Sequence, residues 1–91
     1  MRRAARIDAT QDAIVDALLE AGYRVQTLAM VGHGVADLLV RCPDGRLALI
    51  ECKSPGGTLT PAQKAWITRW PETIVAHTPE EALTALHGSD Q

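Results

Sequence analysis

The sequence predicts a single mixed α/β domain over residues 1–91, in which helices pack on a mixed sheet of about four strands. Two observations lead to this fold class. Apolar residues recur at helical spacing at the start, in the second half and at the end of the chain. Four short segments rich in Val, Ile and Leu are bounded by Gly, Pro and Asp. The expected order of elements is α-β-β-β-α-β-α.

An apolar stripe predicts the first helix over residues 8–21, with Gly22 as its C-cap, and residues 1–6 are expected to be a frayed start. The opposite side of this helix carries acidic residues four positions apart: Asp8, Asp12, Asp16 and Glu20. We expect this stripe to face solvent, and DNA would not lie against it.

Strands are expected at residues 23–30, 35–41, 46–53 and 73–77. The second helix is predicted to start with Thr60 as N-cap, Pro61 at N1 and Gln63 at N3, the pattern of a capping box. The same pattern begins at Thr78 and predicts a last helix that ends near Gly88.

The segment CPDG (42–45) predicts a tight hairpin with Gly45 in the left-handed conformation. In that register the numbers of paired residues add up to 88, so Asp37 lies directly opposite Glu51. Lys53 follows one pleat further along the same face. A two-residue loop would instead place Asp37 on the other face of the sheet.

Two adjacent carboxylates repel each other unless a positive charge lies between them. A Mg²⁺ or Mn²⁺ ion held by Asp37 and Glu51, with Lys53 beside it, would suit metal-assisted phosphodiester hydrolysis. The competing interpretation is a solvated Asp37 and a surface pair of Glu51 and Lys53 that contributes less than about 1 kcal/mol.

Several motifs resemble the PD-(D/E)XK nuclease signature, and more narrowly the virus-type replication-repair nuclease (VRR-NUC) domain in its small stand-alone phage and prophage form. They are GVADLLV (34–40), LIECK (49–53) and LTPAQKAW (59–66). The resemblance extends from RIDATQDAIVDAL (6–18) to HTPEEALTAL (77–86). It implies a restriction-endonuclease-like αβββαβ core with a C-terminal helix.

The resemblance assigns metal binding to Asp37 and to Glu51, and it matches Glu51 and Lys53 to the (D/E)XK pair. Gln63 matches a glutamine that members of the family place near the site, and the backbone carbonyl of Cys52 would be a further metal ligand. For Gln63 the capping box is an alternative role that is compatible with this one.

The same comparison implies one more polar residue from the first helix, for which Asp8 and Gln11 are the candidates. Ala36 departs from the family pattern, which usually has Pro before the Asp. Because that Pro supplies no chemistry, we expect activity to survive the change.

The candidate DNA contacts are His33, Lys64, Arg2 and Arg3. For His33, a loop histidine without a functional role is the competing interpretation. Trp66 and Trp70 lie four positions apart and form a packing ridge, expected in the core or at a dimer contact rather than as a platform for bases.

The net charge of −2 argues against a protein that coats nucleic acid through a uniformly basic surface. Residues 21–71, however, contain six basic and three acidic residues, so the middle of the chain is positive. The two cysteines, Cys42 and Cys52, lack metal-ligand spacing and are expected to be reduced thiols. No apolar run is long enough for a membrane helix, and the start of the chain is not expected to be a secretory signal. The expected location is the cytoplasm, for a bacterial-host or phage-encoded protein.

The sequence therefore predicts a Mg²⁺- or Mn²⁺-dependent DNA endonuclease. Stand-alone proteins of the type it resembles are similar to Holliday-junction resolvases, which would act here as a C2 homodimer on branched DNA. Two alternatives are a monomeric nuclease for flaps or nicks, and an inactive DNA- or protein-binding module on the same scaffold.

Overall fold

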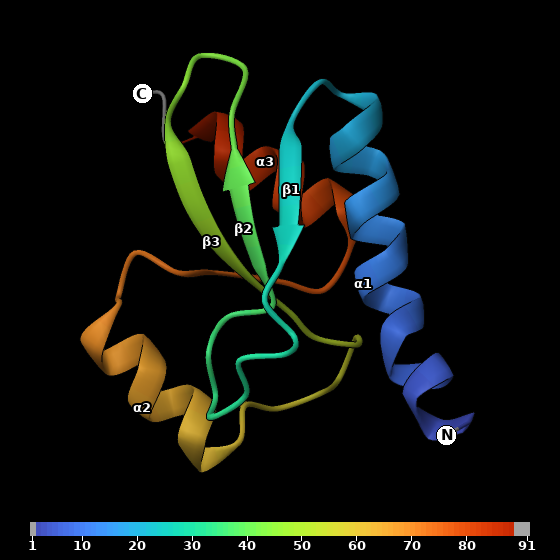
Figure 1. Ribbon diagram of the computed structural model, residues 1–91, viewed down its shortest axis with the longest axis vertical. Helices are drawn as coiled ribbons and strands as arrows, with labels where there is room; N and C mark the ends of the chain where they lie inside the picture. The colour runs from blue at the N-terminus through green and yellow to red at the C-terminus, as the bar shows by residue number, and fades with distance from the viewer. Residues whose placement is uncertain (1, 89–91) are drawn as a thin grey trace.

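A computed structural model describes the chain over residues 2–88, with side chains described from residue 9 onward. The elements follow the predicted order: α1 (Arg2–Glu20), β1 (Arg24–Thr27), β2 (Leu38–Arg41), β3 (Leu47–Cys52), α2 (Pro61–Arg69), β4 (Ile74–Ala76) and α3 (Pro79–Gly88). The fold is α/β with a mixed sheet and helices at both ends, consistent with a restriction-endonuclease-like core (Figure 1).

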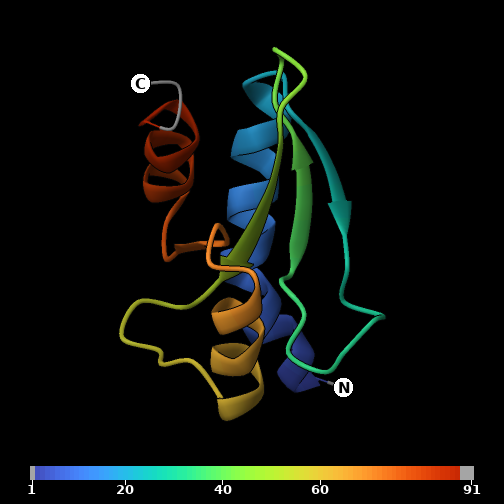
Figure 2. The same ribbon diagram turned by 90° about the vertical axis from the view of Figure 1, so that its left-hand side faces the viewer.

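The four strands form one sheet in the order β1-β2-β3-β4. The pairs β1–β2 and β2–β3 are antiparallel, whereas β3 and β4 are parallel and are joined through α2. Helices α1 and α3 pack on the same side of the sheet, and α2 lies beyond the end of β3 rather than over the strands (Figures 1 and 2). Residues at the end of the sheet next to α2 are therefore separated from the main core.

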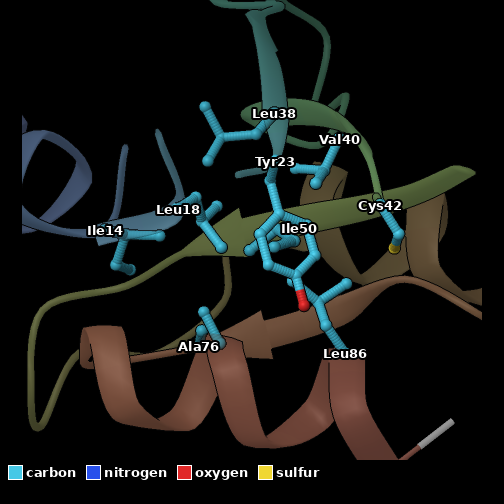
Figure 3. Packing of buried hydrophobic residues seen from close by; sticks show 10 residues of the cluster. Ile14, Leu18, Tyr23, Leu38, Val40, Cys42, Ile50, Ala76 and Leu86 are labelled. Carbon is cyan, nitrogen blue, oxygen red and sulfur yellow. The ribbon is translucent and has the colours of Figure 1, made fainter. Parts of the chain in front are cut away.

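The core lies between the sheet and the α1–α3 layer (Figure 3). Its buried residues come from both helices, from the strands and from the segment between α1 and β1: Ile14, Leu18, Tyr23, Leu38, Val40, Cys42, Ile50, Ala76, Ala82 and Leu86. Leu38, Val40 and Ile50 alternate with residues that point to the other face, as a sheet covered on one side requires.

Strand β1 ends at Thr27, three residues earlier than the sequence pattern predicts. The backbone N–H of Leu28 still donates to the carbonyl of Asp37, at 2.7 Å, and the chain then leaves the sheet. Gly32, His33 and Gly34 all have positive φ (73°, 57° and 79°), which no strand can accommodate. The same turn delays the start of β2 to Leu38.

Helix α1 begins at Arg2, before residue 8, and so includes most of the segment for which a frayed start is expected. Residues 2–6 consist of Arg and Ala, both of which have high helix propensity. The side chains of Arg2, Arg3 and Asp8 lie outside the described residues. No helix within residues 2–88 is long and apolar enough to cross a membrane.

Helix α2 starts with the predicted capping box. The Gln63 N–H donates to Thr60 Oγ1 at 3.2 Å, and Gln63 Oε1 accepts from the Thr60 N–H at 2.9 Å. None of the nine residues of α2 is buried. Interactions at the two ends of the helix, rather than an apolar face, therefore determine its position.

Trp66 and Trp70 stack on each other, with ring centroids 5.3 Å apart, and Trp66 Nε1 donates to Thr73 Oγ1 at 3.1 Å. Trp70 remains 43% exposed, and neither ring belongs to the buried core cluster. Of the two packing roles that the sequence suggests for this pair, the core is therefore excluded. The dimer contact stays a prediction.

Candidate active site

The β2–β3 hairpin has the predicted register. Leu38 pairs with Ile50 and Val40 pairs with Ala48, so the numbers of paired residues add up to 88. The Cys42 N–H donates to the Arg46 carbonyl at 2.8 Å, and Gly45 has a φ of 98°. The next pair beyond Leu38–Ile50 is Asp37 and Glu51, on the face opposite the core. The hairpin prediction is confirmed.

The two carboxyl groups meet at the end of β3. A side-chain hydrogen bond joins Asp37 and Glu51, and Asp37 Oδ2 also accepts from the backbone N–H of Cys52 at 2.8 Å. Glu51 is only 2% exposed, and Gln63 Nε2 donates to Glu51 Oε2 at 2.9 Å. The backbone of β3 thus orients Asp37, and α2 orients Glu51.

Burial raises the pKa of Glu51 to about 8, and the negative charge of Asp37 and its hydrogen bond add to the increase. The nearby Lys53 ammonium opposes this effect but does not cancel it. Below that pH the free protein therefore holds a proton on the carboxyl pair instead of two adjacent negative charges.

The donor set fits a hard divalent cation. Glu51 Oε1 is buried without a hydrogen-bond partner, beside a second carboxylate. Among the described residues no group of three or more His, Cys, Asp or Glu side chains could hold a metal. An ion here would thus have two carboxylates as side-chain ligands, which suits Mg²⁺ or Mn²⁺ because such ions retain several waters. Cys52 would contribute only its backbone carbonyl, since burial raises the pKa of its thiol to about 12.

Lys53 follows β3, and its backbone N–H donates to the Ala76 carbonyl at 3.0 Å. The next four residues form a closed turn in which the Gly57 N–H donates to the Ser54 carbonyl at 2.8 Å. A Cβ atom at Gly57 would lie 3.8 Å from Lys53 Cδ, so this turn packs beside the lysine stem. Local backbone structure therefore holds the ammonium group near Glu51.

Gln63 makes both of the contacts that its two expected roles require. Its Oε1 caps α2 through the Thr60 N–H, while its Nε2 contacts Glu51. A single amide can do this because one end accepts and the other donates. The capping box thereby links the start of α2 to the carboxylate pair.

The other sequence candidates are not joined to this cluster by any hydrogen bond or ion pair between described side chains. Gln11 is half-buried on α1, His33 is exposed in the loop between β1 and β2, and Lys64 is exposed beside Gln63. Asp8, Arg2 and Arg3 lie outside the described side chains. The roles assigned to these six residues stay predictions.

One contributor to the site was missed at the level of sequence. A Cβ atom at Gly34 would lie 2.5 Å from both the carbonyl carbon and the carbonyl oxygen of Ala62, in the first turn of α2. Only glycine permits this approach, which presses the loop between β1 and β2 against the helix that carries Gln63. The Gly-His-Gly run was a signal for a tight turn, but nothing in it indicated what the turn contacts.

Comparison with protein families matches the chain to the VRR-NUC domain over residues 8–78. This range contains Asp37, Glu51, Lys53 and Gln63 and ends just before α3. Neither curated proteins nor solved structures give a match.

We expect Gly34→Ala to destabilise the fold much more than Gly32→Ala does. Both glycines have positive φ, but only a methyl group at Gly34 meets backbone atoms, because nothing lies within 4 Å of a Cβ at Gly32. Urea unfolding should give a loss of about 1 kcal/mol for Gly32→Ala and about 2–4 kcal/mol for Gly34→Ala. Equal losses in the two variants would show that the contact with Ala62 does not constrain α2.

The carboxyl pair also predicts a pH dependence of stability in the metal-free protein. Because the pKa of Glu51 rises from 4.5 to about 8 on folding, the folded state binds more protons than the unfolded state between these values. Stability should therefore fall by a few kcal/mol as the pH rises from about 5 to 8 in EDTA. Thermal unfolding at several pH values measures this.

Two matched variants complete that experiment. Glu51→Gln should flatten the decline and exceed the wild type in melting temperature at pH 8. Glu80→Gln, which removes an exposed carboxylate on α3, should behave like the wild type. Mg²⁺ at pH 8 should raise the melting temperature of the wild type but not that of Glu51→Gln. A wild-type curve no steeper than that of Glu51→Gln would contradict the assignment of the buried carboxyl pair.

Proposed function

Because the chain belongs to the VRR-NUC family, a family of nucleases, we propose that it is a Mg²⁺- or Mn²⁺-dependent endonuclease that hydrolyses phosphodiester bonds in DNA. One observation carries the proposal: the buried Glu51 carboxylate, with an unpartnered oxygen, beside Asp37 at the end of a core strand. This arrangement costs stability in the free protein, and a metal-dependent hydrolase is the kind of protein that needs it.

In this proposal Asp37 and Glu51 hold the ion, and the Cys52 carbonyl is a further ligand. A bound divalent ion stabilises the negative charge that develops on the phosphate and makes water a better nucleophile. Gln63 maintains the orientation of Glu51 through the bond of 2.9 Å. Lys53 orients the attacking water and stabilises charge at phosphorus.

The reaction is an in-line displacement. The water oxygen forms a bond to phosphorus, the bond between phosphorus and the 3′ oxygen breaks, and a proton reaches that oxygen. The products are ends with a 5′-phosphate and a 3′-hydroxyl, as the family resemblance implies.

Ala36, which stands where the family usually has proline, does not argue against activity. It is fully buried on the core face, whereas Asp37 turns to the other face and contacts Cys52 and Glu51. The substitution therefore leaves the carboxylate pair in contact.

We further propose that two copies assemble as a C2 homodimer that cuts branched DNA in the manner of a Holliday-junction resolvase. Support comes from an apolar patch on the face opposite the core, around a hollow of about 360 Å³ beside the tryptophan stack. The patch consists of Leu39, Leu47, Leu49, Trp66 and Trp70. Leu47 is 68% exposed and Trp70 43%, so the patch offers apolar surface to a second copy. A two-fold interface would cover the patch and place two sites on one junction.

Replacing the proposed catalytic residues should reduce cleavage while the fold is retained. Asp37→Asn, Glu51→Gln and Lys53→Gln are each expected to reduce cleavage about 100-fold or more, because each removes a charge that stabilises the transition state. Gln63→Ala should reduce it less, about 10-fold, because it acts through Glu51. Cleavage is measured by incubating each variant and the wild type, in Mg²⁺ or Mn²⁺, with labelled four-way junctions, flaps, nicked duplex and linear duplex.

Glu80→Gln serves as the control and should cut like the wild type. A preference for junctions supports the resolvase proposal, and a preference for flaps or nicks supports the first alternative. If no substrate is cut, the chain is the inactive binding module instead. If Glu51→Gln cuts as well as the wild type, the catalytic assignment of Glu51 is wrong.

The homodimer is tested by sedimentation at tens of micromolar. The wild type should sediment as a dimer, and replacement of two patch residues, Leu47→Ser with Trp70→Ser, should give a monomer because it removes apolar area from the interface. Leu19→Ser, at an exposed leucine of α1, should leave the dimer intact. A monomeric wild type would contradict the two-fold assembly.

A further inference from the structure

Two arginines face each other at the end of the sheet far from the carboxylate pair. Arg24 is the direct cross-strand partner of Arg41 in the β1–β2 ladder, and both side chains are exposed. Directly opposed residues in an antiparallel pair have Cβ atoms about 4.5–5.5 Å apart, and like charges in such a pair destabilise the sheet. An anion between the two guanidinium groups would remove that repulsion.

No acidic residue of the described chain supplies this anion. Within the described residues the side chains of Arg24 and Arg41 make no hydrogen bond or ion pair, whereas Asp44 of the adjoining turn binds Arg46 through two hydrogen bonds. The pair is thus left with its positive charge directed to solvent.

The arginine pair and the candidate active site share one face of the sheet. Asp37, Leu39 and Arg41 alternate along β2 and so point to the same side, opposite to Leu38 and Val40 of the core. Arg41 lies four positions after Asp37, a distance of about 13 Å along an extended strand. Within residues 2–88 no helix covers this face over β1 and β2 (Figures 1 and 2).

The surface around the pair is hollowed. A shallow depression of about 350 Å³ is lined by Arg24, Val25, Gln26, Leu39, Arg41 and Leu47. Its floor is apolar and its charged groups are both cationic, so it suits an anionic group attached to a larger molecule. Leu47, the cross-strand partner of Arg41, also belongs to the apolar patch, so the arginines lie at the rim of that patch.

We propose that Arg24 and Arg41 form a phosphate-binding site for the DNA backbone, separate from the carboxylate pair. The inference rests on the proposed nuclease function. Guanidinium groups bind phosphate oxygens in a bidentate manner, and two of them at paired positions of neighbouring strands would hold one phosphodiester group. At a rise of 3.4 Å per base pair, about 13 Å along β2 corresponds to roughly four base pairs from the bond that is cut. This site positions the substrate and does not contact the reacting atoms.

The pair of Arg24 and Arg41 also explains how a chain with a net charge of −2 could bind DNA, because its positive charge is local. The acidic residues Asp12, Asp16 and Glu20 lie on α1, which packs on the core side of the sheet (Figure 2), whereas the register places Arg24 and Arg41 on the opposite face. DNA would therefore approach one face only, the one that carries both the arginine pair and the carboxylates.

The test measures binding to labelled junction and duplex DNA by fluorescence anisotropy, with Ca²⁺ replacing Mg²⁺ and the DNA checked to be intact. Arg24→Gln and Arg41→Gln should each raise the Kd several-fold at 50 mM salt. Each should lower the slope of log Kd against log salt by about one, and the double variant by about two. Arg41→Lys should keep the salt slope of the wild type, because the charge remains, but should bind more weakly, because a lysine cannot make the bidentate contact.

Arg46→Gln is the matched control. It removes one arginine charge from the same hairpin, but Arg46 is already paired with Asp44 and lies toward α3, where it donates to the Leu86 carbonyl. Its Kd and salt slope should stay close to those of the wild type. In Mg²⁺, the arginine variants should raise KM and leave kcat unchanged, since the contact is equal in ground state and transition state.

Three results would overturn the inference. The first is a folded Arg24→Gln/Arg41→Gln variant that binds DNA with the Kd and salt slope of Arg46→Gln, even though the wild type binds and cuts DNA. The second is an Arg24→Gln/Arg41→Gln variant that sediments as a monomer but binds DNA with the affinity of the wild type, which would assign the arginine pair to an interface between copies. The third is a wild type that binds no DNA, which would overturn the proposed function as well. If the wild type cuts DNA, the proposed function stands, and only the first two results bear on the arginine pair.

Discussion

The contact between Asp37 and Glu51 is the constraint on which the rest of the structure depends. Two carboxyl groups are brought together at the end of a buried strand, and one of them is almost completely removed from solvent. The arrangement persists because the opposite face of the same strands, with Leu38 and Ile50, is packed into the core and prevents a change of register. A shift by one residue would bury the carboxylates among apolar side chains.

The second supporting element, α2, is held in a different way. It has no buried residue, and its contacts are a glycine-dependent approach to Ala62, the Gln63–Glu51 hydrogen bond, and the Trp66–Thr73 hydrogen bond near its end. A helix attached by a few polar and steric contacts can adjust its position at low cost. It is thus suited to carry a residue that must maintain Glu51 in place both with and without a metal.

The sheet separates stability from function. Its inner face, against α1 and α3, provides the core, while its outer face carries the carboxylate pair, the apolar patch and the two opposed arginines. In a chain of 91 residues one face must therefore serve the proposed chemistry, the second copy and the DNA backbone. The arrangement along β2, with charge at each end and leucine between, lets these proposed contacts coexist: both charged ends remain at the rim when the leucines are covered.

The sequence by itself determined the element order, the hairpin register and the capping box of α2. Each of these depends on residues close together in the chain: alternation around Ile50, the turn at Gly45, and the spacing of Thr60 and Gln63. The motifs also resemble a nuclease family, which the domain match confirms, and that resemblance added the expected place of Gln63 beside the pair of Asp37 and Glu51.

Only the tertiary structure decided the burial of Glu51, the contact between Gly34 and Ala62, and the exposure of Trp70. It also decided where β1 ends, since Met30, expected in a strand, is 98% exposed in the following loop. These features arise where segments far apart in the chain meet, and local propensity contains no information on what a side chain will face. Gln63 illustrates the difference: its capping bond to Thr60 follows from a spacing of three residues, but its bond to Glu51 exists only because α2 folds back against the end of β3.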